Sequence, residues 1–557
     1  MKSTLDFHPK FLASLASYSK EKFTKDLMAG IIVGIVALPL AIAFGIASGV
    51  SPEKGLITAI IGGFIVSFLG GNSVQIGGPT GAFIVIVYGI IQAYGLEGLA
   101  IATFMAGLIL VLMGCFRLGT IIKFIPYPIV VGFTSGIALT IFATQIKDLL
   151  GLSMDSVPAD FISKWVAYFQ HIETTNFWSL GIGILSILII AYTPRISNKI
   201  PGSLMAIILM TVLVYVLERL WGIEGIETIG DRFNISNEVP EPQALNINME
   251  TINQLLSPAF TIAVLGAIES LLSATVADGV IGDKHDSNTE LIAQGVANMA
   301  TPLFGGIPAT GAIARTMANI NNGGKSPVAG IVHAVVLLLI LLLLMPLAQY
   351  IPMGCLAGVL VVVSYNMSGW RVFRALMKNP KSDVTVLLIT FFLTVIFDLT
   401  IAIEVGLVIA CVLFMRRVME TTEISVIKDE IDPNAESDIT TSEEHLIIPK
   451  GVEVYEINGP YFFGIATKFE EVMAQLGDRP KVRIIRMRKV PFIDSTGIHN
   501  LESLCKMSQK EKITIVLSGV NEKVHNALEK SGFYELLGKD NICPNINVAL
   551  EKAKQLL

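Results

Sequence analysis

The chain has 557 residues, of which 52% are hydrophobic and only 15% are charged, and its mean hydropathy is +0.65. This composition excludes an ordinary soluble domain and predicts a protein that spans a bilayer. The net charge is −6, and we expect no nucleic-acid partner.

The opening segment, residues 1–24, is polar and carries Lys20 and Lys22. It lacks a short apolar core with a small-residue cleavage site, so we expect no removable signal peptide. The five cysteines show no CxxC or His/Cys metal spacing, and we expect neither a disulfide nor a metal or other cofactor.

From residue 25 to residue 418 the chain is a series of apolar runs, each about long enough to cross a hydrocarbon core of about 30 Å. We count up to fourteen spans. Their predicted starts lie near Lys25, Gly55, Pro79, Leu96, Ile121, Phe177, Pro201, Thr251, Asn288, Thr310, Pro327, Pro352, Ser382 and Ala402.

Positive residues gather on alternate connections, among them residues 20–25, residues 371–381 and the pair Arg416 and Arg417. Under the positive-inside rule these connections face the cytoplasm, and an even number of spans then places both termini inside. The connection over residues 222–250 is acidic and would face outside.

A helix-breaking phrase occurs twice within apolar runs, as Gly-Gly-Pro-Thr-Gly-Ala at 77–82 and Gly-Ile-Pro-Ala-Thr-Gly-Ala at 306–312. Each phrase ends one segment and begins another, so two helix N-termini are predicted within the depth of the membrane. The phrases fall at the third and tenth predicted spans. Because a repeat of seven spans inserts its second copy upside down, we predict two inverted halves.

The predicted half-helices offer an anion site. Amides at Thr80 to Ala82 and at Gly311 to Ile313 would lack intrahelical partners and would point into one cavity, each terminus carrying roughly half a positive charge. Gly81 and Ala312 are small enough to let a ligand approach the backbone, and the hydroxyls of Thr80 and Thr310 can donate as well. The alternative is two ordinary helix starts whose amides bind water.

After Arg417 the composition changes. We predict a linker over residues 419–445 and, over residues 446–557, a small α/β domain of about 110 residues. The expected strands are 452–457, 482–487 and 513–518, with helices around Phe469, Asn500 and Val524.

These motifs resemble the SulP (sulfate permease) family of anion transporters along nearly the whole chain. The likeness is carried by residues 37–44, 78–82, 126–136, 288–295 and 310–315. Residues 491–497, Pro-Phe-Ile-Asp-Ser-Thr-Gly, resemble the STAS domain that follows the membrane region in this family. Residues 265–272 and 365–368 are most similar to a bacterial branch that includes a C4-dicarboxylate transporter, and this likeness favours succinate-like acids as the cargo.

The resemblance implies further site residues. Phe44 matches a position whose ring lines the anion pocket, whereas Leu40 replaces a polar residue of some members. Arg315 matches a position at which some members have an arginine near the anion. Other members lack an arginine there. A charge at the membrane centre costs about 2.5–3.5 kcal/mol on the insertion scale, so Arg315 either attracts the anion or has a structural partner, for which Glu269 is a candidate.

Glu269 lies in an otherwise apolar run, where a charged side chain costs free energy in the membrane. Ser273 follows one turn later on the same helical face. An anion arriving beside a carboxylate in a partly dry cavity favours protonation of that carboxylate. We therefore predict coupling through Glu269 and Ser273, with H⁺ ahead of Na⁺. In sodium-coupled bicarbonate transporters of the family, Asp and Thr at the matching positions help to hold the cation. A structural partner that neutralises Glu269 is the other interpretation.

Ser495 follows Asp494 at a predicted helix start, which suits either a helix cap or a regulatory phosphosite. Taken together, the sequence predicts a secondary active transporter of sulfate, bicarbonate or a C4-dicarboxylate in the inner membrane. Anion exchange or a channel is the alternative. We expect no enzyme, because no nucleophile, base and oxyanion set is visible. The resemblance implies a homodimer, and the STAS domain could bind a cytoplasmic protein.

Overall fold

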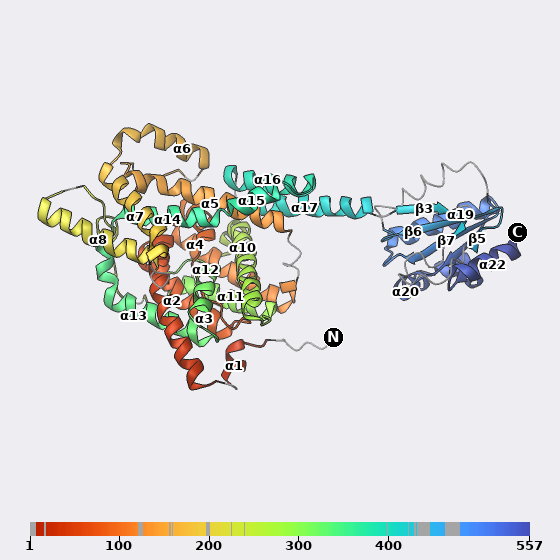
Figure 1. Ribbon diagram of the computed structural model, residues 1–557, viewed down its shortest axis with the longest axis horizontal. Coiled ribbons are helices and arrows are strands. Elements are labelled where there is room, and N and C mark those ends of the chain that lie inside the picture. The colour runs from red at the N-terminus through yellow and green to blue at the C-terminus, as the bar shows by residue number, and fades with distance from the viewer. Residues whose placement is uncertain are drawn as a thin grey trace. The chain divides into compact units, whose positions relative to one another are not determined.

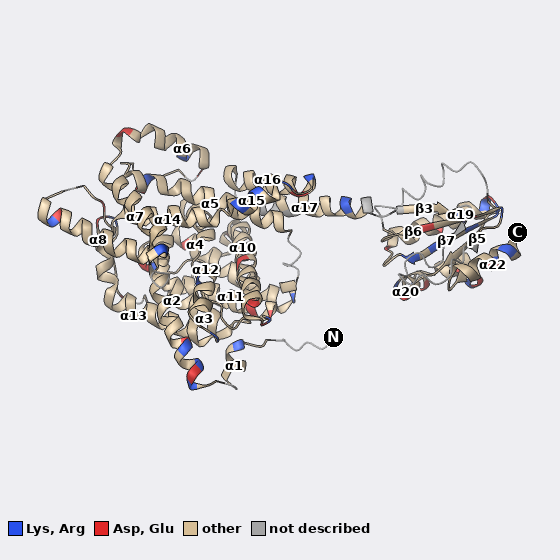
Figure 2. Cartoon of the chain, in the orientation of Figure 1, with Lys and Arg blue, Asp and Glu red and all other residues tan. Residues whose placement is uncertain are grey.

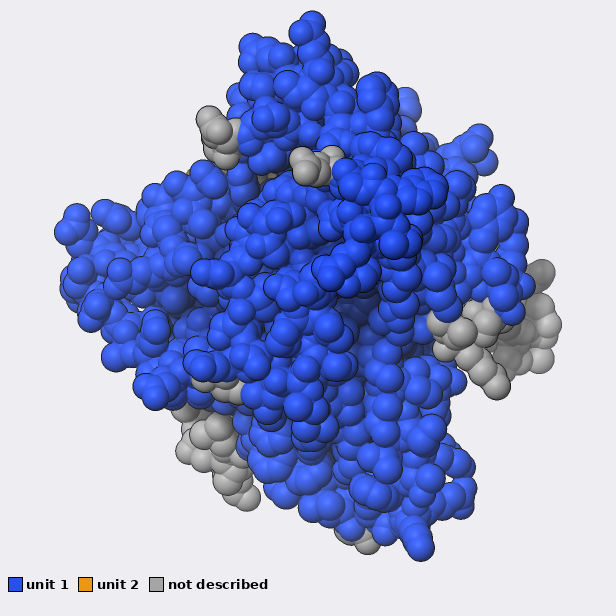
Figure 3. Space-filling view, turned by 90° about the vertical axis from the view of Figure 1, so that its left-hand side faces the viewer, with its two compact units in different colours: residues 1–409 blue, residues 410–557 orange. Residues whose placement is uncertain are grey.

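The computed structural model describes residues 7–15, 18–120, 126–154, 157–158, 160–196, 201–223, 225–238, 240–397, 399–421, 423–427, 430–431, 446–462 and 480–557. The chain forms two compact units, residues 1–409 and 410–557, and each is described by itself. Figure 3 shows one face of the first unit, which fills that view.

The first unit is built of helices (Figure 1). In chain order they are α1 (Lys10–Leu15), α2 (Lys20–Ala47), α3 (Pro52–Leu69), the 3-10 helix η1 (Gly81–Phe83), α4 (Ile84–Cys115), α5 (Tyr127–Leu150), α6 (Phe161–Gln170), η3 (Ile172–Thr174), α7 (Phe177–Ile196), α8 (Gly202–Trp221), α9 (Ile229–Arg232), α10 (Met249–Ile281), α11 (Ser287–Ala300), η4 (Thr301–Phe304), α12 (Ile313–Asn321), α13 (Val328–Leu344), η5 (Met345–Tyr350), α14 (Met353–Met367), α15 (Trp370–Leu376), α16 (Lys381–Ile396) and α17 (Leu399–Thr421), which crosses the boundary between the units.

Several of these helices begin where a side chain accepts a hydrogen bond from a free amide of the first turn. Ser19 does so for α2, Asn248 for α10 and Asp286 for α11. The apolar runs then extend each helix, and Figure 2 shows charged residues mainly toward the helix ends.

Within the described residues, nine helices are long and apolar enough to cross a bilayer. The count of fourteen spans is not confirmed and stays a prediction. The runs predicted to start at Pro79 and Leu96 belong to one long segment, interrupted at Gly95, whose φ of 71° breaks the helix. The predicted start at Ile121 lies outside the described residues, and α5 begins at Tyr127.

Glycines bring the helices of the first unit into close contact. A Cβ on Gly55 of α3 would lie 2.0 Å from the carbonyl oxygen of Ala41 in α2. Gly107 of α4 and Gly295 of α11 face each other so closely that a Cβ on either would lie 2.6 Å from the other's carbonyl oxygen. Small residues at such crossings let helix backbones approach, which is the usual way helices pack in membranes.

Two short strands lie within the helical unit. Strand β1 (Gly77–Gly78) pairs antiparallel with β2 (Thr310–Gly311), and Gly77 lies opposite Gly311. Because η1 with α4 follows β1 and α12 follows β2, this pairing brings together the starts of two helices that are far apart in sequence.

The second unit contains a five-stranded sheet in the order β3-β6-β7-β8-β9. Strand β3 is antiparallel to β6, and the remaining pairs are parallel. The strands are β3 (Glu423–Ile427), β6 (Val452–Asn458), β7 (Val482–Lys489), β8 (Thr514–Ser518) and β9 (Ile542–Cys543); β4 (Glu430–Ile431) and β5 (Leu446–Ile447) form a separate pair.

Helices cover both faces of this sheet. Tyr455, Ile485 and Leu517 pack with α19 (Ser495–Lys510), α20 (Glu522–Lys530) and α21 (Phe533–Leu537). On the other face, Val454 and Ile484 pack with α22 (Ile546–Leu556); the 3-10 helix η6 (Lys539–Asn541) precedes β9.

The three strands and the helices at Asn500 and Val524 are found where the sequence predicts them, and the helix around Phe469 lies outside the described residues. Strand β3 corrects one expectation, because residues 423–427 belong to the sheet although the sequence placed them in a linker.

Candidate functional site

The candidate site lies where the two helix starts meet. Helix α12 begins at Ile313, so its first intrahelical bond runs from the Thr316 amide to the Ala312 carbonyl. In the described chain, the amides of Ile313 and Ala314 have no hydrogen-bond acceptor, and neither do those of Gly81 and Ala82 at the start of η1. Such amides are available to an anion, and both helix dipoles favour negative charge there.

The second set of amides differs from the prediction. We expected Gly311 to Ile313 to supply them, but the Ala312 amide donates to the Ile76 carbonyl at 2.9 Å and Gly311 pairs with Gly77. The strand pairing uses Gly311 and Ala312, so the free amides begin two residues later than expected, at Ile313.

The two starts differ in accessibility. Ile313 and Ala314 are exposed, and Thr80 and Glu269 are half-buried. Gly81 is buried, and a Cβ there would lie 2.9 Å from Met367 Sδ and 3.6 Å from Phe44 Cε1. Phe44 therefore lies against the first helix start, and its role in lining the anion pocket stays a prediction.

The hydroxyls of both threonines form hydrogen bonds within the protein. The Thr80 hydroxyl donates to Glu269 Oε2 at 3.0 Å, and the Thr310 hydroxyl donates to the Gly266 carbonyl at 2.9 Å. Thr310 is fully buried. Its hydroxyl proton is thus used within the protein, which corrects the expectation that Thr310 donates to the anion.

Glu269 and Ser273 do not act on the same partner. Glu269 accepts from Thr80, whereas Ser273 is buried and donates to the Thr316 hydroxyl of α12 at 3.2 Å. The (i, i+4) spacing on α10 predicted that both side chains serve one site, but the Ser273 hydroxyl bonds to neighbouring α12. Among the described residues, Glu269 forms no ion pair.

Arg315 is buried, with 2% of its surface exposed. Its Nη2 donates to the Pro79 carbonyl at 3.0 Å, while Nη1 has no partner in the described chain. A Cβ on Gly78 would lie 2.2 Å from Nη1, so the guanidinium is packed against β1. The interpretation that Glu269 neutralises Arg315 is wrong, because the acid's partner is Thr80. An unneutralised guanidinium beside the helix start adds positive potential to the site.

Gln75 positions the second strand and was missed in the sequence. Its Nε2 donates to the hydroxyl of Ser270 at 3.0 Å and to the Ser270 carbonyl at 3.3 Å. A Cβ on Gly311 would lie only 1.7 Å from this Nε2. The signal was a polar residue two positions before the first repeated phrase.

Polar residues of α11 hold the loops that lead to β1 and β2. Asn298 exchanges hydrogen bonds of 2.7 Å and 2.8 Å with the backbone of Ala309, and buried Glu290 accepts from the Gly71 amide at 2.9 Å and from Gln294 at 2.9 Å. Residues 288–295 carried the family resemblance, but their positioning role depends on tertiary contacts that the sequence does not reveal.

Family models match both units of the chain. Residues 23–390 match the sulfate permease family, and residues 446–549 match the STAS domain. The chain belongs to the sulfate permease family. It is therefore a multi-pass membrane protein of an anion-transporter family and not an enzyme.

Relatives within this family are similar over almost their full length. The chain is 41% identical to the "Putative sulfate transporter YvdB" of Bacillus subtilis (strain 168), over 96% of this chain and 98% of the relative. It is 28% identical to the "Bicarbonate transporter BicA" of Picosynechococcus sp. (strain ATCC 27264 / PCC 7002 / PR-6), over 95% and 94%. The fold matches murine Solute Carrier 26 family member A9, with a TM-score of 0.87 at 19% identity, over 98% of this chain and 94% of that one.

In the STAS domain, Ser495 is not the helix cap. Asp494 caps α19, and its side chain accepts from the Gly497 amide at 2.7 Å. Ser495 is the first residue of the helix and is exposed. The expectation that Ser495 caps the helix is therefore wrong. Phosphorylation of Ser495 stays a prediction. Among the described residues, no cluster of His, Cys, Asp and Glu could hold a metal ion.

Proposed function

We propose that this chain is a secondary active transporter that moves a small oxyanion of the sulfate class together with protons, and that Glu269 carries the proton. The observation that carries the proposal is the 3.0 Å hydrogen bond between Thr80 and Glu269. It links an acidic side chain directly to the helix start that would hold the anion.

The coupling follows from electrostatics. Free amides at Gly81, Ala82, Ile313 and Ala314 attract an anion, but an ionised Glu269 next to Thr80 repels it. Protonation of Glu269 removes this repulsion, so the loaded state favours anion and proton together. Moving both across the bilayer also avoids carrying the carboxylate charge through the membrane.

The substrate proposal is a small oxyanion, with sulfate as the first candidate. The choice of sulfate is supported by the 41% identical relative, which is named a putative sulfate transporter. Bicarbonate and C4-dicarboxylates remain the competing cargoes, since paired helix ends select for negative charge more than for shape.

The test is uptake of radiolabelled sulfate into proteoliposomes at acidic and neutral external pH, with bicarbonate and succinate as competitors. We expect faster uptake at acidic pH and loss of this pH dependence in Glu269→Gln. The control Glu97→Gln removes an exposed acid of α4 and should keep the wild-type profile. Unchanged pH dependence in Glu269→Gln would refute the coupling assignment, and stronger uptake of a competitor would replace sulfate as the cargo.

Sodium-coupled bicarbonate transport is the second candidate, supported by the 28% identical bicarbonate transporter. A sodium site would draw oxygen ligands from neighbouring residues, yet Ser273 donates to Thr316 and not toward Glu269. The contacts therefore favour a proton. Replacing sodium with choline should leave uptake unchanged, and a requirement for sodium would select this alternative.

We further propose an inner-membrane location with both termini in the cytoplasm, supported by the basic residues at 20–25 and 371–381. A homodimer is also proposed, from the family resemblance. Accessibility of single engineered cysteines tests the orientation, and mass measurement in detergent tests the assembly.

A further inference from the structure

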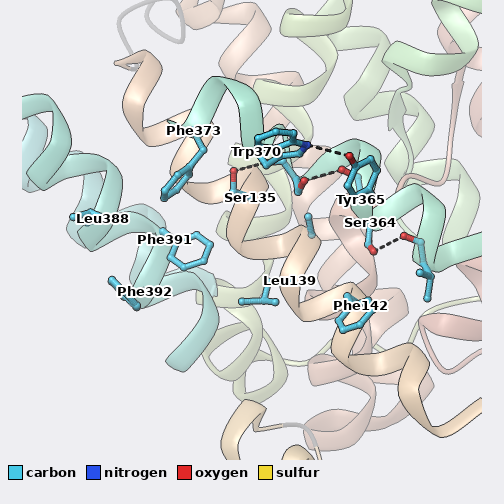
Figure 4. Close-up of a pocket in the computed structure, with 13 residues that line it drawn as sticks. Ser135, Leu139, Phe142, Ser364, Tyr365, Trp370, Phe373, Leu388, Phe391 and Phe392 are labelled. Carbon is cyan, nitrogen blue, oxygen red and sulfur yellow. Dashed lines mark hydrogen bonds between the residues drawn. The ribbon is translucent and has the colours of Figure 1, made fainter. Parts of the chain in front are cut away.

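A large apolar hollow lies outside the proposed transport site. It has a volume of about 520 Å³ and is lined by α5, α14, α15 and α16 together with Ser368. Six of its lining residues are aromatic, namely Phe142, Tyr365, Trp370, Phe373, Phe391 and Phe392. Figure 4 shows their rings around the hollow, with α5 and α14 on one side and α16 on the other.

The serine hydroxyls and the indole N–H in the wall form hydrogen bonds within the protein. Ser135 donates to the Ser368 carbonyl at 2.6 Å, and Ser364 donates to the Val361 carbonyl at 2.8 Å. Trp370 donates from its indole to the Tyr365 hydroxyl at 3.1 Å (Figure 4). Among the hydroxyls of the wall, Tyr365 alone keeps a proton without an acceptor in the described chain, and most of the remaining lining is apolar, which favours an apolar occupant.

The volume suits a hydrocarbon chain. Small-molecule sites range over about 300–1,000 Å³, and an acyl chain fits within that range. Phe392 is exposed and Leu139 is half-buried, so the hollow opens to the surface of a protein that lies in lipid. Burying each methylene of such a chain contributes about 0.8 kcal/mol in water-to-apolar transfer, but much less from lipid, so an apolar hollow alone does not select one lipid.

Selection comes from charge at the rim. Helix α15 carries Arg371 and Arg374, and Lys378 and Lys381 follow; all four are exposed. No described carboxylate forms an ion pair with any of them. Figure 2 shows this basic stretch at α15. Arg371 lies over the ring of Trp370, 5.5 Å from its centroid, so the cationic rim directly adjoins the hollow.

We propose that this hollow is a specific site for an anionic phospholipid, with one acyl chain between α5, α14 and α16 and the phosphate at Arg371 and Arg374. Basic residues at a membrane boundary attract anionic head groups, and Trp370 has the amphipathic ring typical of that boundary. The complementarity of an apolar hollow and a cationic rim commits the site to an anionic lipid over a second protein chain.

A lipid here would reach the transport site through the helices that it contacts. The hollow is lined by Ala138 and Leu139 of α5 and by Tyr365 of α14. Nearby residues of the same helices, Ile141 and Met367, lie against Gly81. Occupancy would thus stabilise the packing of α5 and α14 against the first helix start.

The test is native mass spectrometry of the full-length, delipidated protein with an equimolar mixture of phosphatidylglycerol and phosphatidylcholine of identical acyl chains. We expect preferential retention of phosphatidylglycerol. Arg371→Gln and Arg374→Gln should each reduce that preference about fivefold. Leu139→Trp, which fills the hollow, should reduce retention of both lipids.

The matched control is Arg219→Gln. Arg219 lies 5.9 Å from the centroid of the Tyr215 ring on α8, in the same kind of contact but away from the hollow. It should leave retention unchanged. Equal retention of the two lipids, an equal loss in the Arg219 variant, or full displacement of the lipid by inorganic phosphate would overturn the proposal. A dimer that forms only when no lipid is retained would also overturn it, because a second copy would then occupy the hollow. The arginine variants change exposed side chains only, so they decide the question even if Leu139→Trp does not fold.

Discussion

Thr80 is the residue that joins the proposed anion site to the proposed coupling group. It precedes the free amides of Gly81 and Ala82, and its hydroxyl donates to Glu269 at 3.0 Å. The Thr80 hydroxyl thus connects Glu269 to the first helix start, so a change in the charge of Glu269 acts on that start directly. The sequence predicted both residues but gave no reason to connect them, because 189 positions separate them in the chain.

Thr80→Val should therefore impair transport more than Thr80→Ser. Valine keeps the branched shape but removes the donor, and a hydrogen bond to a charged group contributes about 1.5–3 kcal/mol. We expect at least a tenfold loss in the initial rate of sulfate uptake for valine and near wild-type uptake for serine. Equal rates in the two variants would show that the hydroxyl has no part in transport.

Gly311 requires the absence of a side chain for a definite steric reason. A Cβ would lie 1.7 Å from Gln75 Nε2, and Gln75 would have to leave its two bonds to Ser270. Gly311→Ala should lose about 1–3 kcal/mol of stability for the stranded buried groups, and most uptake with it.

Gly89→Ala is the control for this change, because nothing lies within 4 Å of a Cβ at Gly89. Thermal unfolding in detergent should show a lower Tm for Gly311→Ala only. A Tm and an uptake rate equal to those of the control would mean that β2 tolerates a side chain and that the close packing is incorrect.

Arg315 tests whether charge or a hydrogen bond matters at the site. Arg315→Gln keeps a side chain able to donate toward the Pro79 carbonyl but removes the positive charge. If the guanidinium attracts the anion through its field, apparent affinity for sulfate should fall about five- to thirtyfold, as for a charge interaction of about 1–2 kcal/mol. Sulfate titration against the thermal stability of the purified variant measures this, and unchanged affinity would assign Arg315 a structural role alone.

At the scale of elements, the sequence predicted those features that are local. The Gly-Pro phrases predicted two interrupted helices, and β1 pairs with β2 where those phrases lie. Alternating apolar runs predicted β6, β7 and β8. Strand β3 was missed because its residues, Glu423–Ile427, follow a charged stretch and become a strand only by pairing with β6.

The parts of the site that could not be predicted depend on tertiary contacts. The Ala312 amide donates to the Ile76 carbonyl. The Thr310 hydroxyl donates to the Gly266 carbonyl, and the Ser273 hydroxyl donates to the Thr316 hydroxyl. Each residue type was compatible with the predicted role, but a neighbouring element satisfied it first. Helical spacing places residues on a face and does not say which helix packs against that face.

Helix α19 packs on the STAS sheet, and a cysteine in this helix, Cys505, allows the packing to be tested by thiol labelling. Burial raises the pKa of the Cys505 thiol to about 12, against an ordinary value of about 8.5. Since the thiolate is the reactive form, Cys505 should label very slowly with a maleimide at about pH 8 and faster as the pH rises.

An introduced Ser495→Cys provides the comparison, because position 495 is exposed at the start of the same helix. In a background where the other cysteines are serine, it should label at least a hundredfold faster than Cys505 at about pH 8. Comparable rates would mean that α19 does not cover the sheet as described.

At the scale of the whole molecule, the account predicts that a chemical gradient of protons drives anion entry. Helices α4 and α11, which pack through Gly107 and Gly295, hold the two helix starts together, because α4 continues η1 and Asn298 of α11 binds the backbone of Ala309. Helices α5 and α14 pack against the first start at Gly81. Movement between these two groups of helices would open the site to either side of the bilayer, and Glu269 would be exposed to each side in turn.

The most direct measurement follows sulfate uptake and lumenal pH at the same time in proteoliposomes that contain a trapped pH indicator. For the wild type, the account predicts that added sulfate acidifies the lumen in proportion to the sulfate taken up. In Glu269→Gln, acidification should be lost even where some sulfate still enters. Sulfate uptake by the wild type without acidification, or acidification that persists in Glu269→Gln, would contradict proton coupling through this residue.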